Sequence, residues 1–246
     1  MSFKDREKSI LEYLSENREV SIDELCAKLF VSAPTVRRDL KALAEVGKII
    51  RTHGGAFLNT PPWESAPQEI REKEFVFEKD IIARKCLDLI KDGDTIMVDA
   101  SSTGLHLLRL LGAKSSVILI TNSTKASAIT EKTSVKTFIC GGEVSKTSFA
   151  YVGTLAEEFV RKFNADICFF SVSVLTPDGK LTDNSIAENQ ISKTMMECSK
   201  KSVLLLNSQK IGEPQLNTLC TLSDVDFVAC EKDISDKFPA FKEKFI

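Results

Sequence analysis

The chain has 246 residues, of which 43% are hydrophobic and 28% are charged, and its formal net charge is −2. This length is ample for a buried core and long for a single domain. The slightly acidic balance excludes a protein that coats nucleic acid non-specifically, so any affinity for DNA must come from a local basic patch. The N-terminus is charged and no apolar run approaches the length of a membrane span, so we expect a cytoplasmic protein with no membrane partner.

Seven cysteines are scattered singly along the chain, with no CxxC pair. Most stand within apolar runs, as in Ile139-Cys140, so we expect buried thiols in a reducing compartment rather than disulfides. With only two histidines and no paired ligands, the sequence argues against a zinc site, and we expect no cofactor.

Two short helices are predicted at the N-terminus. Residues 5–16 repeat apolar residues at helical spacing. The apolar face of this helix is made by Ile10, Leu11 and Leu14. Ser21 and Glu24 form a capping box that opens a second helix. The apolar stripe of the second helix is Ile22, Leu25 and Leu29.

A third helix begins after a turn at Phe30-Val31. Ser32 is a suitable N-cap, Pro34 stands in the first turn, and Gly47 is suited to the C′ position. The buried face of this helix is expected to hold Val36, Leu40 and Leu43. The opposite face and its margins carry Pro34, Thr35, Arg37, Arg38 and Lys41. Two helices joined by a short turn in this way form a helix-turn-helix.

Residues 48–55 predict two short strands, or a wing, with glycines where the backbone must turn sharply. Between residues 33 and 53 there are five Lys or Arg (37, 38, 41, 48 and 51) against two acids (39 and 45). This local excess of positive charge indicates a DNA-binding face. The alternative is a small helical domain whose arginines are only a solvated surface.

Residues 31–56 resemble the DNA-binding signature of the DeoR family of bacterial repressors. The resemblance is carried by VS-x-x-T-V-R-R-D-L and by the later run Ile50-Arg-Thr-His-Gly-Gly-Ala56. It implies a winged helix-turn-helix in which Arg51 and His53 touch the DNA backbone or minor groove from the wing. It also implies that the residues approaching the major groove are Ser32, Thr35, Arg37 and Arg38. With Pro34 and Lys41 these residues complete the predicted DNA-binding set.

A proline-rich stretch, FLNTPPWESAPQ over residues 57–68, breaks both helical and strand periodicity. It holds three of the seven prolines and Trp63, the only tryptophan. Such a segment is typical of a semi-rigid linker. We therefore predict a winged helix-turn-helix domain over residues 1–57, a linker over 58–69 and an effector-sensing domain over 70–246.

From residue 70 onward, predicted helices alternate with short, continuously apolar strands. This order predicts an α/β fold with a mostly parallel sheet that is covered on both faces. The predicted helices are 77–91, 104–111, 123–131, 154–163 and 185–198. The predicted strands are 95–99, 117–121, 136–140, 167–174, 202–207 and near 225–230. His106 is predicted to lie on a helix surface.

Polar turns follow three successive predicted strands of this domain. Ligands of such folds bind beyond the carboxyl ends of the strands, where hydroxyls, backbone N–H groups and helix N-termini can hold an anion. Lys210 could place a cation beside the bound group. The candidate residues are Asp99, Ser101, Ser102, Thr103, Thr121, Asn122, Ser123, Gly141, Gly142 and Lys210. The alternative is that the hydroxyls are only helix caps and the glycines only turns.

The same residues resemble, in order, the effector domain of the DeoR family, which is related to ribose-5-phosphate isomerase and senses phosphorylated sugars. The motifs are Asp99-x-Ser-Ser-Thr103, Thr121-Asn122, Gly141-Gly142, Gly153, Leu181-Thr182, Glu188 and Ser208-x-Lys-Ile-Gly212. The resemblance adds Glu188 to the effector-binding set. The chain departs from the family pattern at Ser171, Ser192 and Asn207, where the family usually has Gly, Lys and Asp.

Two functions from different classes remain. The first is a DNA-binding repressor of carbohydrate-metabolism genes that a phosphorylated sugar releases from double-stranded operator DNA, acting as a homo-oligomer, a dimer or tetramer. We expect it not to be an enzyme. The alternative is a sugar-phosphate isomerase with residual activity, which needs a general base. The candidate carboxylates for that role are Asp99, Asp183 and Glu188.

Overall fold

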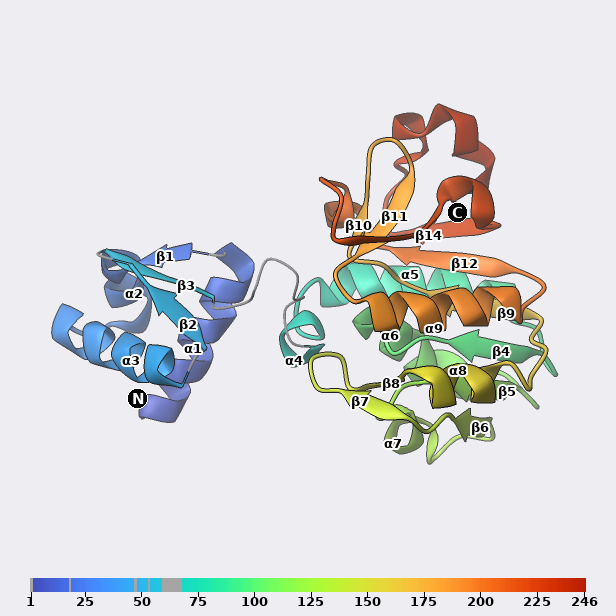
Figure 1. Cartoon of the computed structure of the whole chain (residues 1–246), viewed down its shortest axis with the longest axis horizontal. Coiled ribbons are helices and arrows are strands. Elements are labelled where there is room, and N and C mark those ends of the chain that lie inside the picture. The colour runs from blue at the N-terminus through green and yellow to red at the C-terminus, as the bar shows by residue number, and fades with distance from the viewer. Residues whose placement is uncertain (1, 18, 47, 53, 59–67) are drawn as a thin grey trace. The chain divides into compact units, whose positions relative to one another are not determined.

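The computed structural model of the chain describes residues 2–17, 19–46, 48–52, 54–58 and 68–246. Two units are present, Met1–Ala66 and Pro67–Ile246, and each has its own core. Figure 1 shows the elements of both. Three residues singled out in the sequence, Gly47, His53 and Trp63, lie outside the described residues.

The N-terminal unit contains three helices and a small antiparallel sheet. The helices are α1 (Phe3–Asn17), α2 (Ile22–Leu29) and α3 (Ala33–Glu45). The strands are β1 (Glu19–Ser21), β2 (Ile49–Arg51) and β3 (Gly55–Leu58), in the order β1-β3-β2. The predicted helix-turn-helix and wing are confirmed. The third strand, β1, was not predicted because three residues are too few to show an alternating pattern.

The apolar spacing of the helices accounts for the core of this unit. Each predicted apolar face is buried except for Leu11, which is only partly buried. The predicted capping box forms as well, since the Ser21 N–H donates to Glu24 Oε2 at 2.7 Å and the Glu24 N–H donates to Ser21 Oγ at 3.2 Å. Local sequence therefore fixes where α2 begins and which faces of the three helices meet.

The second unit is built on a six-stranded parallel sheet, which confirms the predicted α/β fold class. Its strands are β4 (Thr95–Val98), β5 (Ile118–Thr121), β6 (Lys136–Ile139), β9 (Ile167–Phe170), β12 (Ser202–Leu206) and β14 (Phe227–Cys230), in the order β14-β12-β9-β4-β5-β6. The flanking helices are α5 (Val76–Leu89), α6 (Ser102–Leu110), α7 (Ala126–Thr130), α8 (Thr154–Val160) and α9 (Ile186–Glu197).

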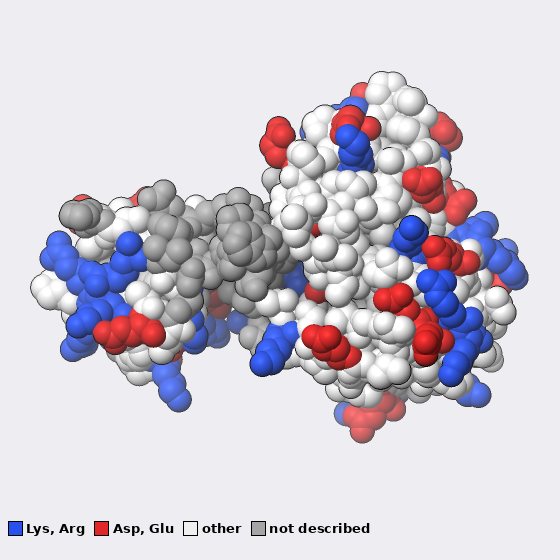
Figure 2. Space-filling model, viewed as in Figure 1, with Lys and Arg blue, Asp and Glu red and all other residues white. Residues whose placement is uncertain are grey.

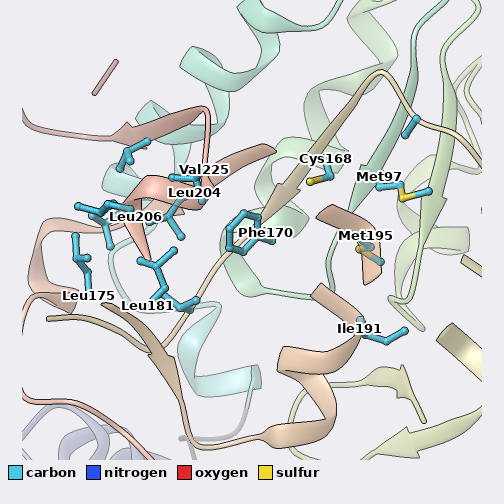
Figure 3. Packing of buried hydrophobic residues seen from close by; sticks show 14 of the residues in the cluster. Met97, Cys168, Phe170, Leu175, Leu181, Ile191, Met195, Leu204, Leu206 and Val225 are labelled. Carbon is cyan, nitrogen blue, oxygen red and sulfur yellow. The ribbon is translucent and has the colours of Figure 1, made fainter. Parts of the chain in front are cut away.

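Alternate residues of each strand point to opposite faces of the sheet. Ile96 and Val98 join the cluster that contains residues of α5, α6 and α7, whereas Met97 joins the cluster that contains residues of α8 and α9. Figure 3 shows Phe170 between the sulfur-containing side chains on one side and the leucines of the smaller sheet on the other. Helices thus cover both faces, as predicted.

Several short elements were not predicted. They are α4 (Gln68–Arg71), the hairpin of β7 (Glu143–Ser145) and β8 (Ala150–Val152), the sheet of β10 (Val174–Leu175), β11 (Lys180–Asp183) and β13 (Asn217–Thr221), and the 3-10 turns η1 (Leu111–Ala113), η2 (Ser208–Lys210), η3 (Leu222–Asp224), η4 (Ser235–Lys237) and η5 (Pro239–Lys244). The strand predicted over 167–174 is β9 followed by the start of β10, because the chain leaves the large sheet after Phe170.

The surface position predicted for His106 is wrong. Its side chain is buried, and Nδ1 lies 2.5 Å from Asp80 Oδ1 of α5. Helix α6 is covered over its first seven residues, since all residues from Ser102 to Leu108 are buried. Among the described residues, no helix combines the length and the apolar character that crossing a bilayer requires.

Candidate functional sites

The predicted DNA-binding residues of α3 lie together on its surface. All are exposed except Thr35, which is partly buried, while the apolar face is inside the unit. Ser32 occupies the N-cap position, but its side chain does not cap a backbone N–H; Ser32 Oγ instead lies 3.1 Å from Thr35 Oγ1. Both hydroxyls therefore stay at the surface at the beginning of α3.

The acids beside this face differ from those in the sequence count, because Asp39 is buried and Glu7 of α1 pairs with Lys48 at 2.8 Å. Asp39 is only 1% exposed and forms a bidentate pair with Arg6 of α1, with Nε–Oδ2 at 2.5 Å and Nη2–Oδ1 at 3.0 Å. One of the two acids of the segment is thus withdrawn from the surface. Figure 2 shows Lys and Arg side chains gathered over the side of the unit on which α3 lies. The described basic residues of α3 and the wing are Arg37, Arg38, Lys41, Lys48 and Arg51.

In the larger unit, the predicted effector residues follow the carboxyl ends of neighbouring strands. The chain runs from β4 to β5 and β6 on one side and from β9 to β12 and β14 on the other, so the direction of winding reverses between β4 and β9. Ligands of open α/β sheets bind at such a reversal. A polar residue directly follows each of four neighbouring strands, and together these residues form a row along one edge of the sheet. In spatial order they are Asn207 after β12, Ser171 after β9, Asp99 after β4 and Asn122 after β5.

Asp99 joins the two strands at the reversal. Its Oδ1 accepts from the Ser101 N–H at 3.0 Å and from Ser101 Oγ at 2.5 Å, and its Oδ2 accepts from the Ser171 N–H at 2.8 Å. Burial raises the pKa of Asp99 to about 6, although these hydrogen bonds and the charge of Lys210 oppose the shift. A Cβ on Gly104 would lie 2.8 Å from the Asp99 carbonyl oxygen, so the first turn of α6 requires glycine here.

Lys210 extends over the end of β9. Its Nζ donates to Ser171 Oγ at 2.8 Å and to the Val172 carbonyl at 2.7 Å. Burial, together with the nearby positive charge of Arg71, lowers the pKa of Lys210 to about 8. Both acceptors are neutral, so the ammonium is held in the site without a directly bonded carboxylate among these contacts.

The short helix α4 and the beginning of α5 contribute residues that the sequence analysis missed. Gln68 is fully buried; its Nε2 donates to the Ala100 carbonyl at 2.5 Å and its backbone N–H donates to the Thr147 carbonyl at 2.7 Å. Lys79 of α5 donates to the carbonyls of Arg71 and Glu74, and burial lowers its pKa to about 8. No local motif marked Gln68, because α4 is only four residues long.

Some buried polar atoms of this edge have no hydrogen-bond partner among the described residues. Buried polar groups in folded proteins are almost always paired, so each exception needs a reason. Four such atoms lie at the strand ends and on α4 and α6: Gln68 Oε1, Thr103 Oγ1, Asn122 Oδ1 and Asn207 Nδ2. A fifth, His106 Nε2, belongs to the contact between α5 and α6.

Other predicted effector residues have structural partners. Ser101 Oγ accepts from the Gly104 N–H at 3.0 Å, which is the cap that the alternative interpretation expected. Thr121 Oγ1 accepts from the Ser123 N–H at 3.1 Å, and Ser123 Oγ accepts from the Lys125 N–H at 3.3 Å. Ser102 is buried in the first turn of α6.

Glu188, in the first turn of α9, binds the loop that joins β7 and β8. Its Oε1 accepts from Ser148 Oγ at 2.7 Å and from Ser145 Oγ at 3.2 Å. Of the family departures, Ser171 and Asn207 lie at strand ends, whereas Ser192 is buried in the middle of α9. Thr147 of the same loop accepts from Gln68, so Glu188 supports the loop against which α4 is fixed.

The two glycines after β6 differ in what they allow. Gly142 has a φ of +142°, and a Cβ there would lie 2.8 Å from the Val152 carbonyl oxygen, whereas a Cβ on Gly141 would meet nothing within 4 Å. We expect Gly142→Ala to lower the free energy of unfolding of this unit by about 1–3 kcal/mol. Gly141→Ala is the matched control and should be tolerated. Denaturant unfolding of both variants checks this, and equal losses would contradict it.

Two family models match the chain. The DeoR C terminal sensor domain matches residues 74–232, and the DeoR-like helix-turn-helix domain matches residues 6–61. Together they cover both units described above.

Curated relatives are similar over nearly their whole length. The HTH-type transcriptional regulator GolR of Listeria innocua is 31% identical, over 94% of this chain and 91% of that protein. The L-fucose operon activator of Haemophilus influenzae is 28% identical, over 97% and 96%. The glycerol-3-phosphate regulon repressor of Escherichia coli is 29% identical, over 91% and 88%.

Solved structures agree on the fold alone. The δ subunit of eIF2B from Chaetomium thermophilum superposes with a TM-score of 0.50 at 12% identity, over 68% of this chain and 60% of that one. At this identity the likeness concerns the arrangement of helices and strands and not the chemistry of the site.

Proposed function

The chain belongs to the DeoR family of DNA-binding transcriptional regulators, and from this premise we propose that it represses genes of carbohydrate metabolism and leaves its operator when a phosphorylated sugar binds to the larger unit. The name of the Escherichia coli relative, a glycerol-3-phosphate regulon repressor, supports both a phosphorylated effector and repression. The Haemophilus influenzae relative is named as an activator, so repression rather than activation is itself part of what we propose.

The observation that carries the sensor function is the set of buried polar atoms without partners at the sheet edge. Thr103 Oγ1 lies in the first turn of α6, where the positive end of the helix dipole favours an anion. Asn122 Oδ1 and Gln68 Oε1 are acceptors suited to sugar hydroxyls, and Lys210 supplies positive charge. A phosphorylated sugar offers both kinds of partner.

A link between the sensor site and the DNA-binding unit is supported by α4. This helix begins within the last two residues of the predicted linker, and Gln68 bonds to Ala100, which stands between Asp99 and Ser101. A ligand that displaces Gln68 from Ala100 would move α4, the first helix of the larger unit. A difference of about 1–3 kcal/mol in effector affinity between the two states lowers operator affinity roughly 5- to 150-fold.

We also propose that the protein acts as a homo-oligomer, a dimer or a tetramer. One helix-turn-helix contacts only a short half-site, and regulators of this kind reach specificity by binding two half-sites with two copies. Sedimentation of the intact protein, with and without operator DNA, measures this, and a monomer in both conditions would contradict it.

The isomerase alternative has less support. A general base needs a carboxylate oxygen that can reach the substrate, but both oxygens of Asp99 accept from Ser101 or Ser171. Both oxygens of Asp183 also accept from protein donors, as does Oε1 of Glu188. The relatives compared above are named as regulators of transcription. These carboxylates act as structural acceptors, and we propose a sensor without turnover.

Thr103→Val tests the proposed site, because valine keeps the shape of threonine and removes the unpartnered hydroxyl. We expect unchanged affinity for a duplex selected from a random pool, and at least about a tenfold higher sugar-phosphate concentration for release, since a hydrogen bond to a charged group contributes roughly 1.5–3 kcal/mol. Fluorescence anisotropy of labelled duplex measures both.

The matched control is Thr130→Val, which changes a buried threonine of α7 whose hydroxyl donates to the Ala126 carbonyl at 2.9 Å. This variant should respond to ligand like the unaltered protein. Normal release of Thr103→Val would remove the α6 turn from the site. Failure of every sugar phosphate to bind the intact protein would overturn the proposed sensor function.

A further inference from the structure

Asn207 presents a hydrogen-bond donor to the sheet edge at the end of β12. The side chain is 2% exposed, and Oδ1 accepts from the Gln209 N–H at 2.8 Å. Because an N–H must meet the carbonyl oxygen of the amide, this contact identifies which atom is nitrogen. Nδ2 is then the atom left buried without a partner among the described residues.

Charged groups of both signs surround Asn207. Lys210 folds back toward it, with its backbone N–H donating to the Asn207 carbonyl at 2.9 Å and its Nζ over the neighbouring strand end at Ser171. Arg71 is close enough to depress the pKa of Lys210. Two carboxylates are also close, and both are engaged by protein donors. Asp183 accepts from the backbone N–H groups of Ser173 and Asn184, and Glu231 accepts from the Ser208 N–H at 3.0 Å.

The other end of the row has the opposite character. Asn122 turns its Nδ2 to the Tyr151 carbonyl at 3.1 Å and leaves Oδ1, an acceptor, without a partner. Neighbouring strands are about 4.8 Å apart, so Asn207 and Asp99, which end strands two positions apart, are separated by roughly 10 Å along the edge. This distance exceeds what one phosphate can bridge, so a phosphate held at the α6 turn would not reach Asn207.

We propose that Asn207 and Lys210 select an effector with a second anionic group, a carboxylate or a second phosphate, at the end opposite the phosphate bound by α6. The inference rests on the proposed function and narrows its ligand class. The amide N–H donates to this group and the ammonium lies beside it. A carboxylate side chain at position 207 would repel such a group. The uncharged amide therefore determines specificity in two ways, because it donates a hydrogen bond to the second anionic group and does not repel it.

The test compares paired ligands on the intact protein by isothermal titration calorimetry and thermal shift. The pairs are glucose 6-phosphate with 6-phosphogluconate, fructose 6-phosphate with fructose 1,6-bisphosphate, and glycerol 3-phosphate with 3-phosphoglycerate. We expect the doubly anionic member of a binding pair to bind at least about tenfold more tightly. Whether the carboxylate or the second phosphate is preferred separates the two sources of the anionic group.

Asn207→Asp and Asn207→Ser then test the residue itself. The aspartate variant should lose at least about tenfold in affinity for the doubly anionic ligand while the singly anionic partner is little affected. The serine variant removes the amide without adding charge and should weaken the preference without reversing it. Melting temperatures without ligand establish that both variants fold.

Tighter binding of the singly anionic member, or an equal loss for both members in Asn207→Asp, would overturn the inference and leave the proposed function standing. Absence of binding by every ligand of all three pairs would count against the inference and the proposed function together.

Discussion

Lys210→Ala is expected to lower effector affinity by about 2–5 kcal/mol, roughly 30-fold to several thousand-fold, while operator affinity stays unchanged. The ammonium donates to Ser171 Oγ and the Val172 carbonyl, both neutral, so an anionic ligand would be its first directly bonded charge partner among these contacts. Calorimetry with the sugar phosphate that binds best measures the loss. An unchanged dissociation constant would place the anion elsewhere.

The same lysine predicts a pH dependence of effector binding. Burial holds the pKa of Lys210 at about 8 in the free protein, and a bound anion favours the protonated form and raises that pKa. Binding therefore takes up a proton above pH 8, and affinity should fall by up to about tenfold per pH unit as the pH rises beyond 8. Asp99, with a pKa of about 6, is already ionised throughout this range.

Lys210→Arg is the matched control, because a guanidinium stays charged at every pH tested. This variant should bind with an affinity that no longer declines between pH 8 and 9. The control is needed because burial also lowers the pKa of Lys79 to about 8. A decline that persists in Lys210→Arg would assign the titration to Lys79 and contradict the role given to Lys210.

Arg38→Ala is expected to weaken operator binding by about 1–3 kcal/mol if the guanidinium contacts a guanine edge in the major groove. Arg38 is exposed on α3, on the face opposite the buried Leu40. Dissociation constants for a selected operator and for random duplex, each over a range of salt concentrations, measure the effect. The loss should be confined to the selected operator.

Lys8→Ala removes the same charge from an exposed position of α1 and is the control for general electrostatics. It should change binding to both duplexes by a small and equal amount. If Arg38→Ala also weakens both duplexes equally, and reduces the salt slope by about 1, Arg38 contacts phosphate and does not read a base.

Most of the fold could be predicted because its signals are local. The spacing of Val36, Leu40 and Leu43 fixes which face of α3 is buried, and the Ser21–Glu24 box fixes where α2 begins. Short apolar runs between helices predict all six strands of the parallel sheet. Two of the elements that escaped prediction, β1 and α4, are three and four residues long, too short for a period to appear.

The candidate strand-end site could be predicted only as a set of positions. The sequence places hydroxyls after β4 and β5, but it does not distinguish a hydroxyl that caps its own turn from one that is left over. Ser101 and Ser123 accept from N–H groups two or three residues further along, whereas Thr103 Oγ1 has no partner among the described atoms. That difference depends on how each turn is closed.

The sequence by itself determined the two-part organisation, the helix-turn-helix with its exposed basic residues, and the parallel sheet, because these follow from periodicity and from contacts between near neighbours. Only the tertiary structure decided that Asp39 pairs with Arg6, that Gln68 bonds to Ala100, and that Lys210 extends over Ser171. Each of these contacts joins residues more than thirty positions apart. Their partners are chosen by how whole helices and strands pack, and no local pattern of residues carries that information.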